Sequence, residues 1–176
     1  MSMSELHKPE WYGECAIISD KYNDYVQIKY KCNGTGTLYD YSLFPGINLI
    51  FMDFNCSDIF HEPIPNKNII EIRHYQKGRV EFELRNNKVF HMKEGELCIN
   101  ALANVPAAYS FPFGYSVGLS CVIDKDSIDA KTKQIFSYYN IDVLNLGQEL
   151  EIEKKWFLCR TPQRLLHIFD ELYAAK

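Results

Sequence analysis

The segment EIRHYQKGRVEFELRNNKVFHMKEG, residues 71–95, constrains the fold more than any other part of the sequence, because polar and apolar residues alternate along it. Successive side chains of a strand point to opposite faces. Glu71, Arg73 and Tyr75 therefore share one face of a first strand, and Gly78 is expected to break that strand. The run RVEFEL alternates again and predicts a second strand. The pattern leaves open which face of the first strand is buried.

The loop after RVEFEL determines which residues of the next strand lie opposite its apolar side chains. A three-residue loop formed by NNK places Leu84 opposite Phe90. The same loop places Phe82 opposite Met92, so that apolar residues share one face. A two-residue loop would pair Phe82 with His91 and mix polar and apolar residues on both faces. Because asparagine tolerates the left-handed backbone of such loops, we predict the three-residue loop.

The composition is that of a single globular domain. The chain has 176 residues, of which 47% are hydrophobic and 14% aromatic, so it is long enough to bury a core. Its formal net charge of −4 makes direct binding of nucleic acid a poor expectation. No apolar run is long enough to cross a bilayer and no signal-peptide pattern opens the chain, so we expect a cytoplasmic protein with no membrane partner. The six cysteines form no CxxC pair, and we expect them to be reduced.

The chain divides into three regions. Residues 1–24 are expected to form a loosely held leader and a first strand. About eight short strands separated by turn residues dominate residues 25–124 and predict a β-sandwich or barrel, in which the apolar run GINLIFMDF is covered on both faces. In residues 125–176 the apolar spacing becomes helical, with Asp126 or Ser127 as the first N-cap. Thr161-Pro162 is expected to start the last helix.

The spacing of Glu71, Gly78 and Gly95 resembles the two sequence motifs of cupins, which are small β-barrels of jelly-roll type. The wider order of segments is similar to that of the amino-terminal sensor domain of AraC-type bacterial transcription regulators. These segments are FPGINLIFMDFN, IEIRHYQKGRVEFEL, KEGELCIN, SFPFGYSVGLSCVID and LLHIFDELY. The resemblance implies a mainly β fold, a cupin-like jelly-roll β-barrel followed by two or three α-helices.

The histidines of metal-binding cupins are missing from the matching positions. The resemblance places the first ligand pair at Pro65 and Lys67, or one residue earlier at each, and the last ligand at Pro106. Glu71 alone cannot hold a transition metal. Three other histidines are expected at the surface or at strand edges: His61, His74 and His91. We therefore expect neither a metal nor a cofactor.

The resemblance points Glu71 into the barrel, and with it Arg73 and Tyr75. Buried charges are costly unless they are paired. Two interpretations stay open: an internal ion pair that only stabilises the fold, or a guanidinium that binds a carboxylate, a phosphate or sugar hydroxyls beside Tyr75. Phe82 is expected to supply an apolar wall. The predicted ligand-binding residues are Glu71, Arg73, Tyr75 and Phe82, and three weaker aromatic candidates are Phe51, Phe111 and Tyr115. No catalytic constellation or phosphate-binding loop is found.

The last helix carries an apolar stripe whose residues recur at helical spacing. The stripe consists of Leu165, Ile168, Phe169 and Leu172. One interpretation is that the stripe covers the barrel. The resemblance implies instead that this helix pairs with a second copy across a two-fold axis. A single helix also has room for both contacts, with one flank on the barrel and Leu166 or Tyr173 toward the partner.

The resemblance implies a non-enzymatic domain that binds a small-molecule effector and forms a homodimer. AraC-type regulators contact DNA through two basic helix-turn-helix units after the sensor domain, and no such segment is present up to residue 176. We therefore expect a sensor domain cut from a longer protein, or a stand-alone relative. The alternative is a stand-alone cupin enzyme, of isomerase or dioxygenase type, that acts on a sugar or small organic acid. No motif identifies the effector, which is expected to be a sugar or an organic acid.

Overall fold

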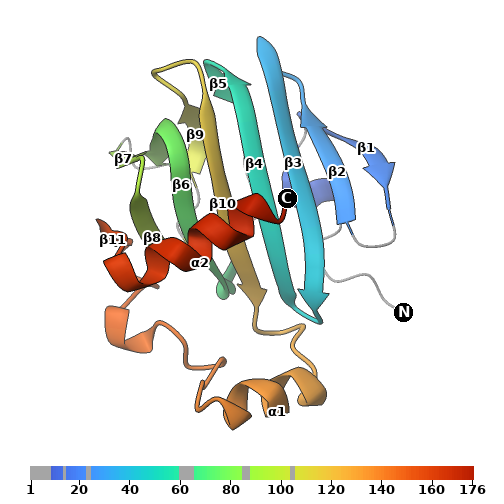
Figure 1. The fold of residues 1–176 in the computed structure, drawn as a ribbon, viewed down its shortest axis with the longest axis vertical. Helices are drawn as coiled ribbons and strands as arrows, with labels where there is room; N and C mark the ends of the chain where they lie inside the picture. The colour runs from blue at the N-terminus through green and yellow to red at the C-terminus, as the bar shows by residue number, and fades with distance from the viewer. Residues whose placement is uncertain (1–8, 14, 23–24, 60–65, 85–87, 104–105) are drawn as a thin grey trace.

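The computed structural model describes residues 9–13, 15–22, 25–59, 66–84, 88–103 and 106–176 (Figure 1). His61, Pro65 and most of the predicted NNK loop lie outside these residues. The strands are β1 (Ala16–Lys21), β2 (Tyr25–Tyr30), β3 (Gly34–Phe44), β4 (Ile47–Cys56), β5 (Asp58–Ile59), β6 (Asn66–Leu84), β7 (Val89–Lys93), β8 (Glu96–Leu102), β9 (Pro106–Ser110), β10 (Ser116–Asp124) and β11 (Phe157–Arg160). The helices are α1 (Ala130–Tyr138) and α2 (Gln163–Ala174), with 3-10 helices η2 (Pro9–Tyr12) and η3 (Gln148–Leu150).

The strands form two antiparallel sheets that are joined through β6. One sheet has the order β1-β2-β3-β4-β10-β6-β8-β11, and in the other β9 pairs with both β5 and β6 while β7 pairs with β6. The first part of β6 pairs with β10 and β8, and its last residues pair with β7 and β9. The predicted class, a mainly antiparallel, cupin-like β fold with two helices near the carboxyl end, is confirmed.

Gly78 lies inside β6 and does not end the strand, contrary to the prediction. The pairing of β6 with β10 skips Gln76, which is therefore an extra residue, a β-bulge. The bulge changes which positions face the core, so that Tyr75 and Phe82 are both buried although one is odd-numbered and the other even-numbered. Gly78 has a φ of 86°, and a Cβ atom there would lie 2.4 Å from the carbonyl oxygen of Tyr115. Glycine thus bends β6 from one sheet into the other.

The hairpin between β6 and β7 has a different register from the predicted one. Phe82 lies opposite Phe90 rather than Met92. The Leu84 N–H donates to the carbonyl of Lys88 at 2.9 Å, so Lys88, which was predicted to lie in the loop, is bonded to β6. The predicted pairing was wrong because a shift of two positions keeps every side chain on its face. The apolar pattern therefore cannot distinguish the two registers. The contact between the two phenylalanine rings, 6.2 Å between centroids, fits the observed register.

The amino-terminal segment is anchored in the core by Tyr12, which is only 1% exposed. The Tyr12 hydroxyl donates a hydrogen bond to the Asp40 carboxylate at 2.5 Å. The side-chain amide of Asn48 donates to the other carboxylate oxygen at 2.6 Å. These bonds satisfy a buried carboxylate on the inner face of β3 and hold the segment around Tyr12 against the body of the fold.

β4 is buried on both faces, as its apolar sequence predicted. Ile50 points into the main core between the sheets, and Leu49 and Phe51 point out of it. α2 crosses this outer face in front of β4, β10 and β6 (Figure 1). Phe169 and Leu172 of α2 pack on Leu49 and Phe51. The carboxyl-terminal helix is therefore part of the fold of this chain.

α1 begins later than predicted. Its N-cap is Asp129, whose carboxylate accepts a hydrogen bond from the Thr132 N–H at 2.7 Å. Asp126 and Ser127, the predicted caps, belong to a turn before the helix, where both donate to the Asp124 carboxylate. The prediction failed because several Asp and Ser residues in a row are equally good caps. α2 begins at Gln163, directly after the predicted Thr-Pro start.

Candidate functional site

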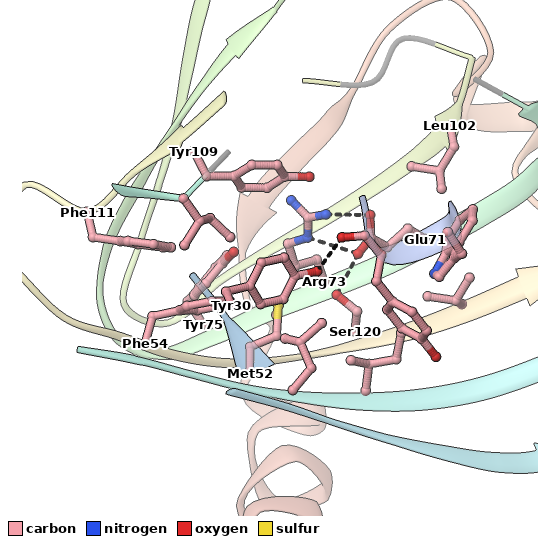
Figure 2. A pocket seen from close by; sticks show the side chains of 16 residues that line it. Tyr30, Met52, Phe54, Glu71, Arg73, Tyr75, Leu102, Tyr109, Phe111 and Ser120 are labelled. Carbon is pink, nitrogen blue, oxygen red and sulfur yellow. Dashed lines mark hydrogen bonds and ion pairs between the residues drawn. The ribbon is translucent and has the colours of Figure 1, made fainter. Parts of the chain in front are cut away.

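A small cavity lies against the inner face of β6 (Figure 2). Glu71, Arg73 and Tyr75 line it from alternate positions of the strand, so the face predicted to be inside is inside. The cavity contains about 60 Å³ of free space. A drug-sized ligand pocket measures roughly 300–1,000 Å³, so this cavity suits only a group of a few heavy atoms. Other residues that line it are Tyr30, Met52, Phe54, Tyr109, Phe111 and Ser120.

Glu71 and Arg73 form a buried ion pair with two parallel hydrogen bonds. Arg73 Nε donates to Glu71 Oε1 at 3.1 Å, and Arg73 Nη2 donates to Glu71 Oε2 at 2.5 Å. The Ser120 hydroxyl, from the neighbouring β10, donates to Glu71 Oε1 at 2.6 Å. Burial, the largest single effect, disfavours the charged guanidinium, but the Glu71 carboxylate together with Tyr109 and Tyr75 outweighs it, and the pKa of Arg73 is raised well above its usual value. Arg73 is therefore a permanent cation inside the fold.

One terminal nitrogen of Arg73 is left over. Nη1 is buried and has no hydrogen-bond partner in the part of the chain that the structure describes. The guanidinium lies 4.9 Å from the centroid of the Phe82 ring and 5.7 Å from that of Tyr109. Burial raises the pKa of Tyr109, although the positive charge of Arg73 and a weak hydrogen-bonding contact with the Arg73 side chain act against this shift. A spare cationic donor therefore faces a mainly aromatic space.

The aromatic residues that were expected to line the pocket lie in different environments. Phe111 lines the cavity, whereas Phe82 lies under the Arg73 guanidinium and is fully buried. Phe51 faces the opposite side of the sheet, where its ring contacts Tyr173. Tyr115 is 44% exposed. Phe51 and Tyr115 were therefore wrong as candidates, because a strand position gives a face only relative to its own neighbours.

Two residues of the site carried no recognisable signal in the sequence. Tyr109, in β9, contacts Phe82 edge-on with the ring centroids 5.2 Å apart. Ser120 pairs with Arg73 across the β6–β10 ladder. Both reach the site through pairing between distant strands, which local alternation does not encode.

His74 occupies the outer face of β6, between two residues that line the cavity. It is 4% exposed, so the prediction of a surface or edge position was wrong for this histidine. Its ring stacks on Phe169 of α2 with centroids 4.1 Å apart. The Tyr173 hydroxyl donates to the backbone carbonyl of His74 at 3.1 Å and lies 3.1 Å from its Nδ1. α2 thus packs on β6, the strand that carries Arg73.

Acid should weaken folding through His74. Burial lowers the pKa of His74, and the Asp170 carboxylate only partly opposes this. In the unfolded chain the histidine takes up a proton at about pH 6.5. In the folded protein it takes up the proton only at a lower pH, so the free energy of unfolding should fall as the pH drops below about 6.5. Urea unfolding at a series of pH values should show a shallower acid limb for His74→Phe than for the wild type. Parallel curves for the two proteins would contradict this role of His74.

The residues of α2 that were predicted to face a partner do not share one environment. Phe169, Leu172 and Tyr173 pack on the sheet, which corrects the expectation that Tyr173 faces a second copy. Leu165 and Leu166 are partly exposed. Ile168 is 44% exposed. Only part of the stripe is thus available for a dimer contact.

No group of three or more metal-ligating side chains occurs among the residues that the structure describes. His91 is exposed and His74 lies under α2. Across the same described ranges, no helix is both long and apolar enough to span a membrane. All six cysteines are free thiols.

Comparisons with known proteins give similar folds but no family. No protein-family model and no curated protein matches the chain. Three solved structures illustrate the likeness. A Cupin 2 conserved barrel domain protein from Salinispora arenicola is 11% identical, with a TM-score of 0.41, over 62% of this chain and 88% of that chain. ToxT from Vibrio cholerae is 10% identical, with a TM-score of 0.43, over 74% of this chain and 48% of that chain.

An HTH_3 family transcriptional regulator from Vibrio cholerae is 16% identical, with a TM-score of 0.38, over 49% of this chain and 50% of that chain. The present chain thus spans about half the length of the two regulators. Identities and scores at this level do not assign the chain to a family or a function.

Proposed function

We propose that this chain is a cytoplasmic, non-enzymatic domain of an AraC-type transcription regulator, which binds a small-molecule effector and dimerises. The observation that carries the proposal is the buried Arg73 guanidinium, which has a terminal nitrogen without a partner in the described ranges and faces an aromatic cavity. Every Glu–Arg pair leaves some N–H groups of the guanidinium over, but a buried nitrogen without a partner is uncommon in a pair that serves only the fold, so Nη1 and the space beside it support a binding role. The order of sequence segments, similar to AraC-type sensor domains, supports the regulatory part of the proposal.

β6 offers a physical route from the cavity to α2. Arg73 faces the cavity, and the next residue, His74, faces the helix and contacts Tyr173. A ligand that shifts β6 would therefore change how α2 packs on the sheet. Such a ligand must bind the two conformations with different affinities, because only differential binding shifts an equilibrium. A separate DNA-binding domain would read the resulting change.

A thermal-shift screen tests the effector site. The compounds are sugars, organic acids and aromatic metabolites, each with and without a chelator. A ligand at a hundredfold excess over its dissociation constant stabilises the folded state by about 2.7 kcal/mol, which is easily measured. The matched control is Glu71→Gln/Arg73→Met, which removes both partners of the ion pair and leaves no lone charge. A screen in which every hit stabilises this control as much as the wild type would refute the site.

Ile168→Glu should convert a dimer into a monomer. Ile168 is 44% exposed, and it is not among the described α2 residues that pack on Leu49 and Phe51, so a charge there opposes association without disturbing the fold. The free energy of unfolding of the monomer should change by less than about 0.5 kcal/mol. Light scattering measures the mass. The matched control is Ile141→Glu, another exposed isoleucine outside α2, which should remain dimeric. A wild-type protein that is already monomeric would end the dimer proposal.

A further inference from the structure

The Arg73 guanidinium enters the cavity with its charge already neutralised. Glu71 occupies both Nε and Nη2, which is the pair of donors that normally grips a carboxylate or a phosphate. Ser120 holds the Glu71 carboxylate in this position with a third hydrogen bond. The pair of Arg73 donors that we predicted to bind an anionic ligand is therefore already bound to Glu71.

What remains for a ligand is Nη1, whose N–H groups have no acceptor among the described residues. Glu71 and Arg73 together have no net charge. A second anion at Nη1 would leave one uncompensated negative charge in a mainly apolar site, which is strongly unfavourable. A neutral oxygen acceptor satisfies the buried donor and adds no charge. The electrostatics of the pair thus favour a neutral ligand.

The walls restrict the rest of the ligand. The space beside Arg73 is bounded by rings, including those of Tyr30, Phe54 and Phe111. Phe54 and Phe111 are stacked, 5.0 Å between centroids. A sugar would bring several hydroxyl groups, and each one buried without a partner is penalised. The free space of about 60 Å³ further limits the ligand to a few heavy atoms.

We infer that the cavity binds a small, neutral, mainly apolar molecule with one carbonyl oxygen, such as a short branched amide or ketone, whose oxygen accepts a hydrogen bond from Arg73 Nη1. The inference rests on the proposed function and names the chemical class of its effector. It replaces the expectation of a sugar or an ionised organic acid. Arg73 then acts as a polarised donor within a neutral pair.

Isobutyramide and isobutyrate test this inference, because the two molecules have nearly the same shape and differ in charge. Each is titrated into the wild-type protein at about pH 7.5, where the carboxylate is ionised, and binding is followed by the backbone amide resonances of β6. The amide should bind about tenfold or more tightly than the carboxylate. Equal or tighter binding of isobutyrate overturns the neutral class but leaves an effector site in place. No saturable binding of isobutyramide also overturns the inference, whereas the proposed function falls only if the wider screen yields no ligand that depends on Arg73.

Glu71→Gln provides a second and opposite prediction. The substitution keeps the shape of the side chain but leaves the Arg73 charge without a counterion. The variant should prefer isobutyrate over isobutyramide, and isobutyrate should raise its melting temperature. If the variant folds only when isobutyrate is added, this rescue also shows that isobutyrate stabilises the variant, as predicted. A variant that retains the preference for the amide would show that the charge of Glu71 does not set the specificity.

Discussion

Arg73→Met should lower the free energy of unfolding by about 3–5 kcal/mol, because Glu71 would stay buried without its cationic partner. Residues Glu71 and Arg73 are only 7% and 4% exposed, so water cannot replace the lost bonds. Ser120 would still donate to Glu71, but one neutral hydroxyl does not balance a full charge. Urea unfolding with linear extrapolation measures the loss.

The double variant Glu71→Gln/Arg73→Met separates the pair from its parts. Removing both charges leaves no lone ion, so the double variant should recover most of the stability that Arg73→Met loses. The non-additivity of the three variants gives the coupling energy of the pair. If Arg73→Met cost less than about 1 kcal/mol, the pair would behave as a solvent-exposed salt bridge, and the buried site would be contradicted.

Phe82→Ala should also cost about 3–5 kcal/mol, through the loss of buried area and the cavity that remains. Phe82 is 0% exposed and is held edge-on by Tyr109 and Trp156, each with ring centroids 5.2 Å away. Its ring also lies under the Arg73 guanidinium. The expected loss therefore includes the support of the site itself. Chemical unfolding of the variant gives the value.

Phe113→Ala is the matched control for Phe82, because Phe113 is 62% exposed. Its loss should stay within about 0.5 kcal/mol. Similar losses for the two variants would mean that Phe82 does not lie in the core between the sheets. A large loss for Phe82→Ala alone would confirm its role beneath Arg73.

Alternation along one strand predicted the most informative part of the site. The spacing placed Glu71, Arg73 and Tyr75 on one face, the resemblance to cupins turned that face inward, and the three residues line one cavity. The same reasoning missed the bulge at Gln76, because a single extra residue changes no residue type. It also treated Gly78 as the end of a strand, whereas the glycine serves as a bend within β6. Local patterns give faces but not the continuity of a strand.

Contacts between segments that are distant in the chain could not be predicted from the sequence. Ser120 reaches Glu71 only because β10 pairs with β6, and Tyr109 reaches Phe82 only through β9. The helical stripe of α2 was recognised, but its spacing is equally compatible with covering a sheet and with meeting a second copy. The contact between His74 and Tyr173 shows that one flank of the helix packs on the sheet, and no sequence rule pairs these residues across 99 positions.

The most direct test of the cavity around Arg73 is the dissociation constant of the strongest ligand from the screen, measured by calorimetry on the wild type and on Glu71→Gln/Arg73→Met. A hydrogen bond from a charged donor contributes about 1.5–3 kcal/mol, which corresponds to roughly a tenfold to hundredfold change in affinity. We expect a loss of this size in the double variant while its fold is retained. An unchanged dissociation constant would contradict it.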